Sequence, residues 1–189
     1  EIKSRYQEII DGLRLSLSLE EDFALLEDNF KKQIGEEYAA SRGEYLNGKI
    51  MAAYLGFAFV DPADMIRFDG NGQFDGEITE KLVVKRLEGL ENAVVPGFYG
   101  AKEDGTIKTF SRGGSDITGS IVAGAIDADL YENWTDVSGF LVTDPRIIPD
   151  PKPIDTITYR ELRELSYMGA TVLHEDAIFP VRKAGIPIN

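Results

Sequence analysis

The sequence predicts an α/β fold in which a mainly parallel sheet carries helices on both faces. Apolar residues recur at helical spacing over the first 55 positions, short apolar runs bounded by turn residues follow, and further helical stretches separate those runs. Helices that alternate with strands are typical of parallel sheets, because the crossover between two parallel strands is usually a helix. At 189 residues the chain is long enough for one domain with a substantial core, so a single domain is expected.

Three helices are expected in the N-terminal part. The apolar face of the first is made by Tyr6, Ile9, Ile10, Leu13 and Leu17. The apolar face of the second is made by Phe23, Leu26, Phe30 and Ile34. Ser18 ahead of two glutamates predicts where the second helix begins. The third is expected from about Glu44 to Leu55.

Strands are expected after residue 55. The apolar runs that predict them are 57–60, 65–68, 93–98 and 107–110, each bounded by Gly, Pro, Asp or Asn. A helix over 79–90 separates the second run from the third. The later elements are expected to be a helix over 115–128, a strand over 130–134, a proline-rich loop over 144–153 and a helix over 159–168. The chain begins in a helix and ends where a strand is starting, so we expect a piece of a longer polypeptide.

Composition excludes several classes of function. The absence of cysteine excludes disulfides and thiolate chemistry, and His174 is the only histidine, so zinc sites and serine hydrolase triads are disfavoured and no metal-ligand set is predicted. A net charge of −13 disfavours nucleic acids and anionic membranes as partners. No apolar run is long enough to span a bilayer, and the N-terminus is no secretory signal, so we expect a soluble cytoplasmic protein.

The strongest local signal is Thr109-Phe110-Ser111-Arg112-Gly113-Gly114-Ser115-Asp116, a predicted strand that runs through two glycines into a helix. Glycines let backbone N–H groups approach a ligand, and a helix N-terminus favours an anion. Arg112 can bind a carboxylate through two bonds, and Asp116 can position a cation or the group being transferred. The alternative is a helix cap at Ser115 or Asp116 with Arg112 in a surface ion pair.

Two weaker signals accompany it. The first is Trp134-Thr135-Asp136-Val137-Ser138-Gly139, in which Thr135 and Asp136 stand at the end of a predicted strand, where α/β proteins bind their ligands. It is followed by Thr143-Asp144-Pro145-Arg146, in which Arg146 could reach the phosphates of a nucleotide. The alternative is that both segments are ordinary turns. Ser41-Arg42-Gly43-Glu44 is expected to open the third helix, where the helix dipole alone favours Glu44, and a functional Glu44 would receive an ammonium group.

These segments, in this order and with Pro96-Gly97-Phe98-Tyr99-Gly100 ahead of the Arg-Gly-Gly turn, resemble aspartate kinases of the amino-acid kinase superfamily. The resemblance runs from about Arg42 to Asn189 and includes Tyr167-Met168-Gly169-Ala170-Thr171-Val172-Leu173-His174. It implies a three-layer α/β/α sandwich, truncated here at the N-terminus, and phosphoryl transfer from ATP, with Mg²⁺, to the side chain of L-aspartate. Such an enzyme serves lysine, threonine and methionine biosynthesis, and the parent enzyme is expected to be a homo-oligomer.

The resemblance also assigns the site. Glu44 would receive the α-amino group of aspartate, Arg112 and Ser115 would bind its carboxylates, and Asp116 would organise the transfer centre. Thr135, Asp136 and Arg146 would contact ATP, with Leu141 where a tyrosine often flanks the nucleotide. Thr171 stands where the family often has a lysine, and His174 in the same segment is expected to be structural.

The family's Lys-Phe-Gly-Gly strand, which holds the ATP phosphates, and its C-terminal ACT regulatory domains have no counterpart in the sequence. Residues 1–189 alone are therefore expected to show no measurable aspartate phosphorylation. Two alternatives stay open: another member of the superfamily, acting on glutamate, acetylglutamate, carbamate or UMP, and a fragment that binds ligand without catalysis.

Overall fold

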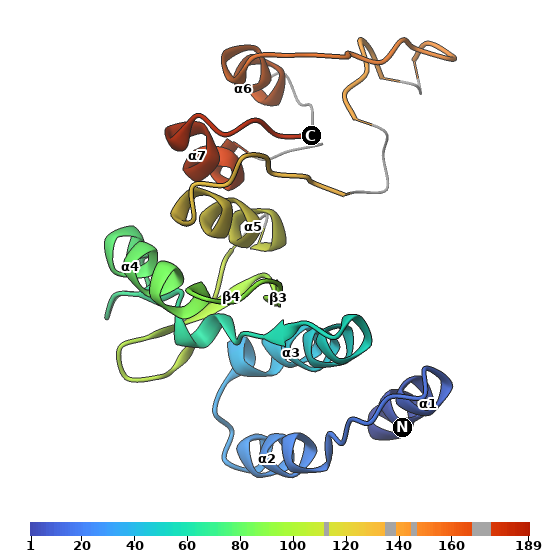
Figure 1. Cartoon of the computed structure of the whole chain (residues 1–189). Helices are drawn as coiled ribbons and strands as arrows, with labels where there is room; N and C mark the ends of the chain where they lie inside the picture. Colours follow the sequence, from blue (N-terminus) through green and yellow to red (C-terminus); the bar gives the residue numbers. More distant parts are fainter. Residues whose placement is uncertain (112–113, 135–138, 145–146, 168–174) are drawn as a thin grey trace. The chain divides into compact units, whose positions relative to one another are not determined.

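The computed structural model describes residues 1–111, 114–134, 139–144, 147–167 and 175–189. These residues form two compact units, unit 1 from Glu1 to Ser115 and unit 2 from Asp116 to Asn189 (Figure 1).

Unit 1 begins with three helices, α1 (Ile2–Gly12), α2 (Glu20–Lys31) and α3 (Glu36–Leu55). Their common core consists of Ile10, Leu19, Leu26, Leu46 and Ile50. The first helix ends five residues short of the predicted Leu17, because the chain turns at Arg14 with a left-handed φ of 54°. Leu17 still packs against this core from outside the helix, which is why the apolar spacing suggested a longer element.

The prediction for the third helix was wrong at its start. The helix begins at Glu36, directly after Gly35 with φ 133°, so Ser41-Arg42-Gly43-Glu44 lies inside α3 and does not open it. The first turns of α3 carry two glutamates, two alanines and one buried aromatic residue, Tyr38, so the apolar pattern there is weak. Glu44 is therefore too far from the helix N-terminus for the dipole to explain its presence.

Strands form small parallel pairs and one hairpin. Strand β1 (Ala58–Phe59) pairs parallel with β3 (Ala93–Val94), and β2 (Arg67–Phe68) pairs parallel with β4 (Tyr99–Lys102). These pairings confirm the predicted α/β class with a mainly parallel sheet. Strand β5 (Ile107–Thr109) runs antiparallel to β4, because Asp104 and Gly105, with φ 82° at the glycine, form a tight turn between them. The predicted run 93–98 ends before β4, which was not expected as a separate strand.

Helix α4 (Gly76–Leu87) separates β2 from β3, three residues earlier than predicted. Asp75 sets its start, since the carboxylate accepts a hydrogen bond of 3.0 Å from the N–H of Ile78. A short 3₁₀ turn, η1 (Pro62–Asp64), precedes β2 and is capped in the same way by Asp61. In Figure 1, α3 lies beside the strands of unit 1, in agreement with its contacts to β1, β3 and β5.

Unit 2 contains α5 (Gly114–Ala125), which begins at the end of unit 1, α6 (Tyr159–Tyr167) and α7 (Glu175–Ala184). Its core consists of Ala123, Leu162, Ile178, Val181 and Ile186. The predicted strand over 130–134 is reduced to a single parallel bridge between Tyr131 and Ile188, which is also where the predicted C-terminal strand lies. None of the described helices combines the length and the apolar character that a bilayer span requires.

Candidate active site

Close backbone packing marks the place where the Pro96–Gly100 segment meets the start of α5. A Cβ added at Gly97 would lie 2.8 Å from Ser115 Cα and 3.1 Å from Ser115 Oγ, closer than real Cβ atoms approach a backbone. Glycine at 97 therefore lets this loop lie directly against the first turn of the helix. Ser115 itself is exposed, so its side chain stays accessible beside this contact.

Phe98 lies at the same junction, and its own backbone is strained. Its φ of 82° lies in the left-handed region, which a bulky side chain adopts at a cost of roughly 1–3 kcal/mol. Two backbone hydrogen bonds offset that cost: the Phe98 N–H donates to the Gly114 carbonyl at 3.1 Å, and the Phe110 N–H donates to the Phe98 carbonyl at 2.9 Å. The Phe98 ring also covers Gly114, where an added Cβ would lie 2.8 Å from the ring. Gly114 is thus fixed from two sides at the start of α5.

Helix α3 contacts the other end of the same loop. At Gly48 an added Cβ would meet Pro96 Cγ at 2.5 Å and the ring of Phe59 at 3.2 Å. Pro96 therefore fits into a gap that glycine leaves on the surface of α3. Through Gly48, Pro96, Gly97 and Ser115, the helix that carries Glu44 is linked by direct contacts to the start of α5.

Glu44 lies on an exposed side of α3. The neighbouring Gly43 carbonyl accepts a hydrogen bond of 3.3 Å from the Tyr6 hydroxyl. Burial first, and the Glu44 carboxylate second, raise the pKa of Tyr6, so this carboxylate lies near α1. Gly43 has nothing within 4 Å of an added Cβ, which leaves the helix surface beside Glu44 open within unit 1.

A second connection joins the first turn of α3 to β5, the strand that precedes Arg112-Gly113-Gly114 in the sequence. Glu37 Oε1 pairs with the Lys108 ammonium at 2.5 Å and accepts hydrogen bonds from the Thr109 hydroxyl at 3.2 Å and the Thr109 N–H at 3.4 Å. Burial opposes ionisation of Glu37, but Lys108 and Thr109 outweigh it and hold the pKa of this carboxyl below its usual value. The end of β5 is thereby fixed to α3 just ahead of Ser111.

We expect Glu37→Gln to lower the free energy of unfolding at pH 7 by about 0.5 kcal/mol, because the ion pair is partly exposed. A carboxyl with a lowered pKa stabilises the fold above its unfolded-state pKa and loses that contribution as the pH falls through the folded-state pKa. The difference between variant and parent should therefore shrink as the pH is lowered and vanish once the pH is below the folded-state pKa of Glu37. Urea unfolding over a series of pH values from neutral downward measures it. Glu77→Gln, which removes a fully solvated pair with Lys81, is the matched control and should change stability less; equal effects would contradict the expectation.

Asp116 is the third residue of α5 and belongs to unit 2, where it is partly buried. Burial raises the pKa of its carboxyl. The Tyr131 hydroxyl donates to the Asp116 carbonyl at 3.2 Å, and the Tyr131 ring lies against Gly119, where an added Cβ would come within 2.8 Å. Burial and the nearby Asp116 raise the pKa of Tyr131 to about 12, so this phenol stays protonated and able to donate at neutral pH. Tyr131 thus supports the first turn of α5 and was not singled out from the sequence.

Several of the residues singled out from the sequence fall outside the described part of the chain. They are Arg112, predicted to bind the carboxylates of aspartate; Thr135, Asp136 and Arg146, predicted to contact the nucleotide; Thr171, where the family often has a lysine; and His174, predicted to be structural. Leu141 is described: it is exposed and forms an antiparallel bridge with Pro153. Across the ranges that the structure covers, no three acidic or histidine side chains gather closely enough to hold a metal ion. Mg²⁺ bound to nucleotide phosphates needs only one or two protein carboxylates, so Asp116 still fits that role.

Comparison with known proteins identifies the family of this chain. A family model described as "Amino acid kinase family" matches residues 5–189. The chain is 40% identical over its whole length to Aspartokinase 3 of Bacillus subtilis, of which it covers 44%. Its fold matches the crystal structure of Clostridium acetobutylicum aspartate kinase with a TM-score of 0.93 and 53% identity, over all of this chain and 43% of that one. It also matches E. coli aspartokinase III in complex with aspartate and ADP with a TM-score of 0.79 and 25% identity, over 98% of this chain and 48% of that one. The chain therefore spans less than half the length of these relatives.

Proposed function

Because this chain belongs to the amino acid kinase family, we propose that it forms part of the catalytic domain of an aspartate kinase. The enzyme would transfer the γ-phosphoryl group of ATP to the side-chain carboxylate of L-aspartate. The observation that carries the proposal is the packing of Gly97 and Phe98 against the first residues of α5, which fixes the start of this helix and leaves Ser115 exposed. Helix N-termini bind anions, and both substrates are anions.

In the proposed reaction, a β-carboxylate oxygen of aspartate attacks the γ-phosphorus of ATP, and the bond from that phosphorus to the bridging oxygen breaks. The products are an acyl phosphate and ADP, and the bridging electron pair leaves with ADP. Catalysis of this kind depends on positioning and charge stabilisation. Mg²⁺ would neutralise charge on the phosphates and bridge them to the protein.

We assign roles on the acceptor side to Glu44, Arg112 and Ser115. Glu44 on α3 would receive the α-ammonium group of aspartate, while Ser115 at the start of α5 and Arg112, which precedes α5 in the sequence, would bind its carboxylates. The contacts from Gly48 through Pro96 and Gly97 to Ser115 would then fix the spacing between the ammonium site and the carboxylate site. Asp116 would orient the transferring group and its cation. Thr135, Asp136, Leu141 and Arg146 would contact the nucleotide.

A coupled assay for ADP release, with aspartate, glutamate, N-acetylglutamate, carbamate and UMP as acceptors, tests the proposal on the full-length protein. Aspartate-dependent release that is trapped by hydroxylamine as the hydroxamate would support it, since an acyl phosphate reacts in that way. Release that depends on another acceptor would assign a different activity within the family. ADP release that none of these acceptors increases would show only ATP hydrolysis and would overturn the proposal.

A further inference from the structure

A buried arginine lies two residues before Glu44 and has no role in the site proposed above. The Arg42 side chain is 8% exposed, although it carries a full positive charge. Its Nε and Nη2 both donate to Ser41 Oγ, at 3.1 and 2.9 Å, and that hydroxyl donates in turn to the Tyr38 carbonyl at 2.8 Å. Within the part of the chain that the structure covers, no carboxylate lies within ion-pair distance of Arg42.

Three tyrosine rings take the place of an ion-pair partner. The guanidinium carbon lies 4.6 Å from the ring centres of Tyr38 and Tyr45 and 5.2 Å from that of Tyr99. The negative face of an aromatic ring attracts a cation, and the attraction is strongest where water is excluded. We call Arg42 with Tyr38, Tyr45 and Tyr99 the arginine cage.

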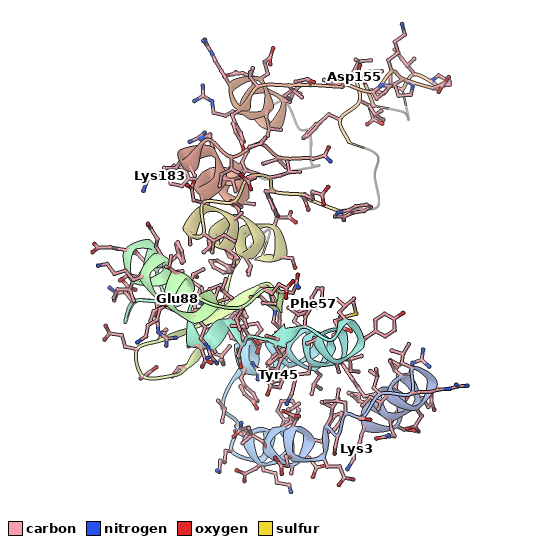
Figure 2. The ribbon with its side chains drawn as sticks, viewed as in Figure 1. Lys3, Tyr45, Phe57, Glu88, Asp155 and Lys183 are labelled. Atoms are coloured by element: carbon pink, nitrogen blue, oxygen red, sulfur yellow. The ribbon has the colours of Figure 1, made fainter. Side chains whose placement is uncertain are left out.

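Each ring of the cage is fixed at its hydroxyl by a different side chain: two of these side chains lie on α2 and the third is Asp61. Asn29 on α2 donates to the Tyr38 hydroxyl at 2.7 Å. The Tyr45 hydroxyl donates to Asp22, also on α2, at 2.9 Å. Figure 2 shows Tyr45 between α2 and α3. The Tyr99 hydroxyl donates to Asp61, the residue that caps η1, at 2.9 Å. Burial and the nearby Asp61 raise the pKa of Tyr99, and burial together with Asp22 raises the pKa of Tyr45, so both phenols stay protonated.

The position of the cage relates it to the acceptor side of the site. Arg42, Tyr38 and Tyr45 lie on α3, the helix that carries Glu44, whereas Tyr99 opens β4 directly after Gly97 and Phe98. Tyr99 is fully buried, so the strand cannot shift relative to α3 without disturbing the arginine. The cage therefore fixes α3 to the same segment that positions Ser115.

We infer that Arg42 is a positioning residue for the acidic acceptor: the arginine cage sets the spacing between Glu44 on α3 and the Gly97–Ser115 contact at the start of α5. This inference rests on the proposed function. A cation among three rings is directional, because the planar guanidinium stacks on aromatic faces and a lysine ammonium does not stack in the same way. Arg42 would act on how the acceptor is held and would touch neither substrate.

The test compares Arg42→Met and Arg42→Lys with the parent in the full-length protein, by steady-state kinetics for each substrate and by thermal unfolding. Methionine keeps an unbranched apolar chain against the rings but removes the charge. We expect Arg42→Met to raise the aspartate KM by about tenfold, since small displacements of positioned groups are costly, while the ATP KM changes less than about twofold. Arg42→Lys should restore part of the loss, because an ammonium keeps some attraction to the rings.

Arg86→Met is the matched control, since Arg86 forms an exposed ion pair with Asp64 and should leave both KM values unchanged. A parent enzyme that fails to phosphorylate aspartate would refute the proposed function. A parent that does so, with an Arg42→Met variant whose aspartate KM is unchanged, would refute the inference alone. Equal changes in both KM values with a lowered melting temperature would also refute it, because they would show a purely structural role.

Discussion

Gly97→Ala is expected to lower kcat/KM for aspartate by about 10²-fold, because a displacement of about 1 Å at a positioned group costs that much. The added methyl would lie 2.8 Å from the Cα of Ser115, which is backbone and cannot rotate away. Either the loop before β4 or the first turn of α5 must move. Kinetics for each substrate, together with the melting temperature of the variant, measure the effect.

Gly12→Ala is the control for this variant. Gly12 ends α1, lies in no left-handed conformation and has nothing within 4 Å of an added Cβ, so alanine should be tolerated there with unchanged kinetics. A Gly97→Ala variant with parental kinetics would show that the contact between Gly97 and Ser115 does not control the acceptor site.

Arg112→Ala is expected to raise the aspartate KM by roughly tenfold to a hundredfold, since a hydrogen-bonded pair with a charged group contributes about 1.5–3 kcal/mol. The reason is the proposed bidentate contact between the guanidinium and a carboxylate of aspartate, two residues before Gly114. Arg112→Lys should recover little, because an ammonium cannot reproduce the two parallel bonds.

The readout for Arg112 is a pair of saturation curves, one for aspartate and one for ATP. Arg5→Ala, which removes an exposed pair with Glu8, is the matched control. An aspartate KM that stays at the parental value would remove Arg112 from the acceptor site, and a shift confined to the ATP curve would place it on the nucleotide side.

Much of the fold could be predicted because its signals are local. The α/β class followed from apolar periodicity, and the strand positions 58–59, 67–68 and 107–109 all fall inside predicted runs. The N-terminal boundary of α3 could not be predicted, because it depends on tertiary contacts of Tyr38 and Arg42 rather than on an apolar stripe. The hairpin between β4 and β5 was not among the predicted elements, although Asp104-Gly105 is a residue pair typical of hairpin turns.

The candidate site likewise has one part that the sequence predicts and one part that only the folded structure shows. Glycines and charged residues in short motifs pointed to Glu44, Ser115 and Asp116 from the sequence. What the glycines contact could not be predicted, since Gly48 and Pro96, or Gly97 and Ser115, are distant in sequence and meet only in the folded unit. The arginine cage could not be predicted for a related reason. A single arginine between a serine and a glycine does not indicate that Tyr38 and Tyr45 on the same helix and Tyr99 on a distant strand surround it.

The different strand pairings of unit 1 also set an order in which the unit can fold. The β4–β5 hairpin closes a short loop, and hairpins form within about 1–10 μs. The two parallel pairs join partners about 35 positions apart, so each must close a much longer loop before it gains any contact. Amide protons of β4 and β5 that face each other should thus become protected in pulse-labelled hydrogen exchange before those of β1 and β3, and the opposite order would show that α3 recruits β1 and β3 first. Since Tyr99 begins β4, the hairpin would then be the preformed surface onto which α3 docks its arginine.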